Sequence, residues 1–165
     1  MTQSIADAKS FHEILEIAIG RELRAQQNYH RLSELVNEKG LKNKLVFLAN
    51  EEDSHRVHLV ELFEKLSGTT APAPVTQESA PAEKHVPASL KDILSAAMKK
   101  EQESHDFYRS AMEKAAEPHL KVIFEHLAHE EDIHRQMLSL ELQVLEERES
   151  GSPLETVPWH MKDLW

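Results

Sequence analysis

The chain reads Leu48-Ala49-Asn50-Glu51-Glu52-Asp53-Ser54-His55-Arg56, and 79 residues later it reads Leu127-Ala128-His129-Glu130-Glu131-Asp132-Ile133-His134-Arg135. Each copy contains the pattern Glu-x-x-His, as Glu52 with His55 and as Glu131 with His134. Side chains three positions apart lie on the same face of an α-helix. Each copy can therefore present one carboxylate and one imidazole to the same point.

The apolar residues around the two copies indicate that this point is buried. They recur at alternating steps of three and four, which is the stripe that a bundle helix buries. Burying ionisable groups costs several kcal/mol each, and a bound cation is the simplest compensation. Glu51, Asp53, Glu130 and Asp132 lie beside the stripe, and we expect them on a solvated face. The two stripes are Leu45, Leu48, Glu52, His55, Leu59, Leu62 and Leu66, and Phe124, Leu127, Glu131, His134, Leu138 and Leu145.

Two further helices are predicted, each with one acid on its buried stripe. The first begins near Ser4 or Ser10 and ends near Gly40, because glycine commonly terminates a helix. The third begins at Ser89, where Asp92 can complete a capping box. The second and fourth helices are expected over about 41–66 and 119–149. The additional stripes are Leu15, Ala18, Glu22, Ala25, Tyr29, Leu32 and Val36, and Leu94, Ala97, Glu101, Ser104, Tyr108, Ala111 and Ala115.

The first predicted helical hairpin is repeated in the second half of the chain. Residues 10–66 and 89–145 align without a gap, and 19 of the 57 positions are identical. The identities include the pairs Glu22/Glu101, Tyr29/Tyr108, Glu52/Glu131 and His55/His134. Two copies of one helical hairpin, related by a pseudo-twofold axis, would bring four carboxylates and two imidazoles to one centre. Such ligands suit iron or manganese, and four carboxylates can bridge two ions.

Composition agrees with an all-α protein and limits its chemistry. The 165 residues include 4 glycines, 5% aromatic residues and no cysteine, so the chain offers no thiolate for catalysis or for an iron–sulfur cluster. A net charge of -10 argues against nucleic acid and anionic membranes as partners. The sequence offers neither a membrane-spanning run nor a signal peptide, and we expect a cytoplasmic protein.

The predicted domain organisation is one four-helix domain, residues 1–149, followed by a tail, 150–165. Within the domain, hairpins at about 10–66 and 89–148 are joined by a linker, 67–88, which is rich in proline and alanine and holds four of the seven prolines. The tail contains Trp159 and Trp165. We expect these aromatic residues to dock on the bundle or on a partner subunit.

In these residues the chain resembles the rubrerythrins of the ferritin-like di-iron carboxylate superfamily, over about residues 10–148. The resemblance implies an antiparallel ferritin-like four-helix bundle that binds two iron ions, with manganese as the alternative metal. It implies that Glu22 and Glu101 are terminal or bridging ligands. It also implies that Glu52 and Glu131 bridge the ions, and that His55 and His134 bind one ion each. Tyr29 and Tyr108 would form hydrogen bonds to ligand carboxylates; ordinary core packing is the alternative for these two residues.

Two departures from the family pattern bear on activity. Rubrerythrins typically carry an iron–thiolate domain, whereas this chain has no cysteine, so electrons for a peroxidase would come from a separate donor. The family also has a further glutamate one turn after the third-helix ligand, which takes part in ligand exchange linked to peroxidase activity. The corresponding residue here is Ser104, which weakens the expectation of a peroxidase.

The leading functional hypothesis is a di-iron peroxidase or ferroxidase that couples Fe(II) oxidation to reduction of hydrogen peroxide or O2, in oxidative stress or iron handling. A second hypothesis is a non-catalytic metal-binding or iron-delivery protein that acts through a partner. A third is hydroxylation of an organic substrate, which needs an apolar pocket beside the site. A purely structural bundle, with hydrogen-bonded buried groups and no metal, is the fourth. By resemblance the chain forms a homodimer, with exchange of hairpins between protomers as one arrangement.

Overall fold

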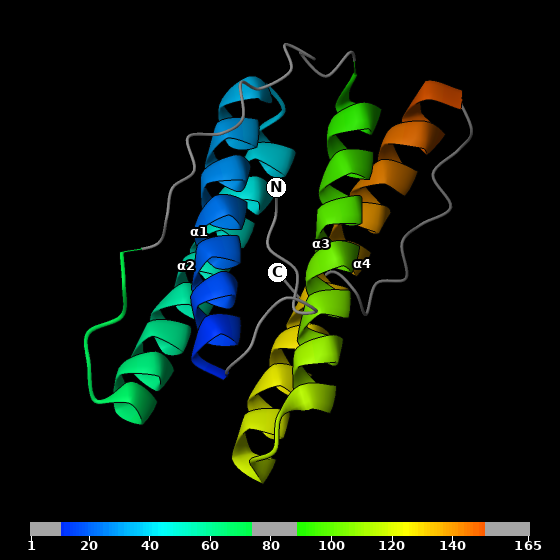
Figure 1. Cartoon of the computed structure of the whole chain (residues 1–165). Helices are drawn as coiled ribbons and strands as arrows, with labels where there is room; N and C mark the ends of the chain where they lie inside the picture. The colour runs from blue at the N-terminus through cyan, green and yellow to red at the C-terminus, as the bar shows by residue number, and fades with distance from the viewer. Residues whose placement is uncertain (1–10, 74–88, 151–165) are drawn as a thin grey trace.

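The computed structural model describes residues 11–73 and 89–150. They form four helices, α1 (Phe11–Leu35), α2 (Lys39–Ser67), α3 (Leu90–Lys114) and α4 (Pro118–Ser150). Figure 1 shows α1 and α2 as one antiparallel hairpin and α3 and α4 as a second hairpin beside it. α1 and α4 run in one direction, and α2 and α3 run in the other. The predicted four-helix bundle of two hairpins is confirmed.

The turn between α1 and α2 differs from the prediction. α1 ends at Leu35, and Gly40 lies in the first turn of α2. The carboxylate of Glu38 caps α2, because it accepts hydrogen bonds from the backbone N–H groups of Gly40 at 2.9 Å and Leu41 at 2.5 Å. The expectation that Gly40 terminates the first helix was therefore wrong. The glycine that ends a helix in left-handed conformation is Gly68, with φ of 69° after α2.

The start of the second hairpin agrees with the prediction. Ser89 caps α3, and its hydroxyl accepts a hydrogen bond from the backbone N–H of Asp92 at 3.2 Å. Pro118 is the first residue of α4, where its missing N–H costs nothing and its fixed φ suits the helix. Ser4 and Ser10, most of the linker, and the tail with Trp159 and Trp165 lie outside the described residues.

The core consists of two apolar clusters, one towards each end of the bundle. One cluster includes Leu15, Leu59 and Phe124, and the other includes Leu45 and Leu138. On every helix the predicted ligand residues fall between the segments that form the two clusters. Apolar side chains therefore exclude water from both ends of a buried polar layer in the middle of the bundle.

The far end of α2 departs from the predicted stripe. Phe63 is buried, with 5% of its surface exposed, whereas Leu66 is 39% exposed and Leu62 is half-buried. An α-helix has 3.6 residues per turn, so a stripe read at 3.5 residues per turn drifts by about 20° every seven residues. Three heptads of drift rotate Leu66 away from the core and bring Phe63 into it.

Within residues 11–73 and 89–150, none of the helices is long and apolar enough to cross a membrane.

Candidate metal centre

All six predicted ligand residues are buried at the centre of the bundle. Between 1% and 7% of the surface of each is exposed. Each hairpin contributes one acid from its first helix and one Glu-x-x-His pair from its second helix. The residues are Glu22 on α1, Glu52 and His55 on α2, Glu101 on α3, and Glu131 and His134 on α4.

The six residues form two overlapping sets that could each hold a cation. One set is Glu22, Glu52, His55 and Glu131, and the other is Glu52, Glu101, Glu131 and His134. Within each set one potential ligand atom of every residue lies within 4.8 Å of the others. Glu52 and Glu131 belong to both sets. An ion in each set would therefore share these two carboxylates.

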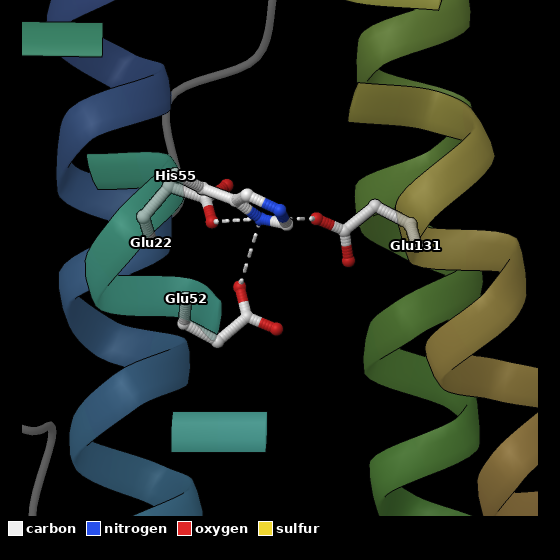
Figure 2. Close-up of side chains that lie close together, drawn as sticks. All are labelled: Glu22, Glu52, His55 and Glu131. Carbon is white, nitrogen blue, oxygen red and sulfur yellow. Dashed lines mark ion pairs between the residues drawn. The ribbon is translucent and has the colours of Figure 1, made fainter. Parts of the chain in front are cut away.

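Figure 2 shows the first set, with side chains from three helices pointing toward one another. Nδ1 of His55 lies 3.4 Å from Oε2 of Glu22, 3.8 Å from Oε1 of Glu131 and 3.9 Å from Oε2 of Glu52. These oxygens surround the imidazole nitrogen without forming a hydrogen bond to it. One imidazole nitrogen and the oxygens of three carboxylates therefore face one another.

The second set has closer contacts around its imidazole. Nδ1 of His134 lies 3.1 Å from Oε1 of Glu52 and 3.6 Å from Oε2 of Glu101. The rings of His55 and His134 lie nearly parallel, with centroids 5.7 Å apart and an interplanar angle of 16°. The two halves of the centre thus face each other across the pseudo-twofold axis.

Unpartnered polar atoms show that protein contacts alone do not satisfy this cluster. Four buried atoms of the centre have no hydrogen-bond partner, and each such atom costs about 1–3 kcal/mol in a folded protein. Divalent cations would satisfy these atoms and offset the charge of the carboxylates. Four carboxylates with two imidazoles are ligands that iron and manganese accept. The residues therefore fit a two-metal centre; the unpartnered atoms are Oε2 of Glu22, Nδ1 of His55, Oε2 of Glu101 and Oε1 of Glu131.

Two tyrosines connect the hairpins beside the centre. The hydroxyl of Tyr29 on α1 donates a hydrogen bond to Oε1 of Glu101 on α3. The hydroxyl of Tyr108 on α3 donates one to Oε1 of Glu22 on α1. Burial and the neighbouring carboxylates raise the pKa of both tyrosines well above 10.0, so both hydroxyls remain donors at neutral pH.

Burial and mutual repulsion separate the acids into two kinds. Burial, followed by the charges of nearby Glu22 and Glu101, raises the pKa of Glu52 well above 4.5. Burial, followed by the charges of Glu52 and Glu22, raises the pKa of Glu131 well above 4.5. Burial would also raise the pKa of Glu22, but His55, Glu52 and Tyr108 together hold it below 4.5. The two shared acids are therefore the ones that hold protons most strongly.

Ser104 lies one turn after Glu101, the ligand predicted on α3, at the position where the resemblance implies a further carboxylate. Ser104 accepts a hydrogen bond of 3.2 Å from Nη2 of Arg21 on α1. The guanidinium of Arg21 also stacks over the ring of Phe107, 4.8 Å from its centroid. Ser104 is thus paired with an arginine and is not a carboxylate.

Glu51 and Glu130 were expected on a solvated face, but both are half-buried. They lie close enough to each other and to His134 to form a third set of potential ligands. The neighbouring Asp53 does form a partly exposed pair, at 2.8 Å, with Arg56 one turn later.

A cavity of about 540 Å³ opens between α2 and α4 beside the centre. Its wall includes Leu59, Leu62, Ile123 and Leu127, and His55 also forms part of the wall. Sequence reasoning did not locate this cavity, because it depends on how the two hairpins lie against each other.

Comparisons with known proteins agree with the geometry. A family model described as rubrerythrin matches residues 13–142 and, in a second match, 92–157. An uncharacterised protein of Bacillus subtilis (strain 168), YhjR, is 28% identical over 120 residues, which cover 73% of this chain and 78% of that protein.

Two solved structures have a similar fold. A hypothetical protein from Pyrococcus furiosus matches with a TM-score of 0.70 and 28% identity, over 87% of this chain and 94% of that one. Bacterioferritin from Rhodobacter capsulatus, described with a metal-free dinuclear site, matches with a TM-score of 0.70 and 22% identity, over 89% of each chain. This second likeness supports the ferritin-like fold.

Proposed function

Because this chain belongs to the rubrerythrin family, we propose that it is a non-haem di-iron oxidoreductase that couples oxidation of Fe(II) to reduction of hydrogen peroxide or O2. The observation that supports this proposal most strongly is the pair of four-residue sets that share Glu52 and Glu131. A structural bundle without metal would leave four polar atoms of this cluster buried and unpartnered.

Each candidate ligand has a role in the proposal. Glu22 and His55 would hold one ion, Glu101 and His134 would hold the other, and Glu52 and Glu131 would bridge them. Bound iron would supply one-electron redox steps and a coordination position for the oxidant. The carboxylates offset the positive charge, and the hydrogen bonds from Tyr29 and Tyr108 fix Glu22 and Glu101 in position.

The chain's own residues also account for the proton balance of metal uptake. Glu52 and Glu131 have raised pKa values, so they retain protons to higher pH than exposed acids and release them when cations bind. Reduction of one hydrogen peroxide molecule to two water molecules consumes two protons and two electrons. The chain contains no cysteine, so we propose that the electrons of a peroxidase cycle come from a separate donor.

Ser104 bears on the choice between peroxidase and ferroxidase. The Ser104 hydroxyl is neutral and accepts a hydrogen bond from Arg21. It therefore cannot supply the negative charge that a carboxylate ligand would bring to a metal ion. We therefore propose that peroxide reduction in this chain proceeds without the additional carboxylate of the family pattern. Ferroxidase activity with O2 is the alternative within the same proposal.

The test is oxidation of the Fe(II)-loaded chain by each oxidant in turn. The chain is loaded anaerobically and mixed with either hydrogen peroxide or O2, while near-ultraviolet absorbance of oxidised iron is followed. Faster oxidation by peroxide, ending at two irons per chain, indicates the peroxidase. Faster oxidation by O2, with uptake continuing beyond two irons, indicates the ferroxidase. If neither hydrogen peroxide nor O2 changes the absorbance, the proposal is contradicted.

A further inference from the structure

The cavity between α2 and α4 has the size and lining of a site for a small organic molecule. Its volume of about 540 Å³ lies within the range of roughly 300–1,000 Å³ that is common for ligand pockets. A water-sized molecule such as O2 or hydrogen peroxide needs only a small part of this space. Part of the wall is apolar and consists of Leu59, Leu62, Ile123 and Leu127. Burial of a hydrocarbon body against these side chains would be favourable, because it removes apolar surface from water.

The charged groups of the cavity lie at one end of it. Glu51 and Glu130 line the end next to the metal centre, since each directly precedes a candidate ligand. Leu62 and Val122 line the other end. The helical rise places Glu51 about 16 Å from Leu62 along α2. The cavity is therefore acidic at its inner end and apolar at its outer end, which suits an elongated molecule with a cationic head.

The internal repeat provides a comparison for this cavity within the same chain. Leu62 and Ile123 of the cavity wall correspond, at the offset of 79 residues, to Glu141 and Lys44. Lys44 and Glu141 form an ion pair that connects α2 to α4. In the half of the bundle around His134, an ion pair therefore connects α2 to α4. The equivalent positions in the half around His55 hold the apolar side chains of Leu62 and Ile123.

The exposure of the two imidazoles agrees with this difference. His55 is 7% exposed and His134 is 2% exposed. Of the six candidate ligands, only His55 forms part of the cavity wall. A molecule in the cavity would therefore approach the centre from one side.

We propose that this cavity is a binding site for a small organic amine, with its apolar body between Leu62 and Ile123 and its ammonium group facing Glu51 and Glu130. An alkylamine resembles a lysine side chain, which is protonated at neutral pH. The two carboxylates attract such a cation, and the net charge of -10 adds to the attraction. The imidazole of His126 lies at this end of the cavity, with Nδ1 3.7 Å from Oε1 of Glu130, and can also contact the head group. This binding concerns the cavity wall and does not require a bound metal.

The test uses decylamine as the probe, because a ten-carbon chain is long enough to reach from the two carboxylates to Leu62 and Ile123. Decan-1-ol and decanoate are the neutral and anionic probes of the same length. Each is titrated into the full-length chain at pH 7.5, with detection by calorimetry and by NMR of the leucine, isoleucine and valine methyl groups. Saturable binding of decylamine is expected, with the largest shifts at Leu62, Val122 and Ile123. Decanol should bind at least tenfold more weakly, and decanoate more weakly still.

Two double variants test the location. Leu62→Glu with Ile123→Lys copies the ion pair of the other half and should weaken decylamine binding at least tenfold. Lys44→Ile with Glu141→Leu changes the corresponding positions of the other half and should leave binding at the first cavity unchanged. Should the first variant fail to fold, methyl shifts in the unaltered chain still decide the location. Shifts outside the cavity, or equal binding of all three probes, would overturn the proposal.

The test separates this inference from the proposed function. Iron uptake by the unaltered chain is measured in the same preparations. Two irons bound without amine binding would overturn the inference alone. Amine binding without iron uptake would support the cavity site and contradict the di-iron proposal.

Discussion

The hydroxyl of Tyr108 on α3 donates a hydrogen bond to the carboxylate of Glu22 on α1. The repeat gives the reciprocal contact, because Tyr29 on α1 donates to Glu101 on α3. Each tyrosine therefore orients an acid of the other hairpin. The centre is thus held together by contacts that cross between hairpins, as well as by the proposed metal ions.

Replacing Tyr108 by phenylalanine tests this crossed arrangement. Tyr108→Phe leaves a buried carboxylate oxygen without its donor, so the metal-free chain should lose about 1–3 kcal/mol of unfolding free energy. Tyr29→Phe should have a similar effect, because it removes the reciprocal contact. Ser95 is exposed on α3, and Ser95→Ala should change stability by less than about 0.5 kcal/mol. Urea denaturation of the three variants checks the prediction, and equal stability of all three would contradict it.

The stability of the metal-free chain should fall as pH rises above about 4.5. Glu52 and Glu131 have pKa values raised above 4.5 in the folded state, so the folded chain binds more protons than the unfolded chain in this range. Unfolding free energy then decreases with pH until both acids have ionised. The lowered pKa of Glu22 acts with the opposite sign, but its effect is confined to pH values below 4.5.

With metal bound, the stability of the folded chain should instead increase as pH rises. Cations require deprotonated carboxylates, so metal affinity rises with pH and stabilises the folded chain. Thermal unfolding from pH 5 to pH 8, with and without Fe(II) under anaerobic conditions, checks both signs. A metal-free chain that becomes more stable over this range would show that the shared acids do not hold protons as described.

Replacing both shared acids by leucine should separate stability from metal binding. Glu52→Leu with Glu131→Leu removes two buried ionisable groups, and the metal-free chain should gain about 1–4 kcal/mol of unfolding free energy. The variant should lose all stabilisation by Fe(II). Glu125 is an exposed acid on α4, and Glu125→Leu should retain that stabilisation. Fe(II)-dependent shifts in melting temperature distinguish the variants; a shift that persists in the double variant would place the metal elsewhere.

Replacement by alanine should have opposite effects on unfolding free energy at Gly68 and at Gly20. Gly68 has a φ of 69°, so Gly68→Ala should cost about 1 kcal/mol, because L-residues are disfavoured in the left-handed region. Gly20 lies within α1, where a new Cβ would meet only the end of the flexible Arg24 side chain at 3.3 Å. Gly20→Ala should stabilise the chain by up to about 1 kcal/mol. Chemical denaturation gives both signs, and destabilisation by Gly20→Ala would show that Arg24 cannot move.

Most of the fold could be predicted because the apolar stripes and the internal repeat indicate the same four helices. The apolar stripes gave the four helices, and the repeat of Glu22, Tyr29, Glu52 and His55 placed one polar layer across all of them. The burial of these residues and of their counterparts follows from the same stripe. Such agreement is expected where local pattern and overall fold are consistent.

The remaining features depend on geometry that a stripe does not contain. Gly40 was read as the end of a helix, but the Glu38 carboxylate caps the next helix first. Leu66 was placed in the core because the stripe was read without its drift. The proximity of Glu51 to Glu130, and the cavity beside them, arise from the packing of α2 against α4. That packing joins segments far apart in the sequence.

The most direct measurement is anomalous diffraction at the iron edge from crystals of the full-length chain grown anaerobically with Fe(II). The account predicts two iron peaks per chain, both within bonding distance of Glu52 and Glu131, with His55 on one ion and His134 on the other. Crystals with intact bundles and no iron peak among these six residues, or with iron bound only elsewhere, would contradict it.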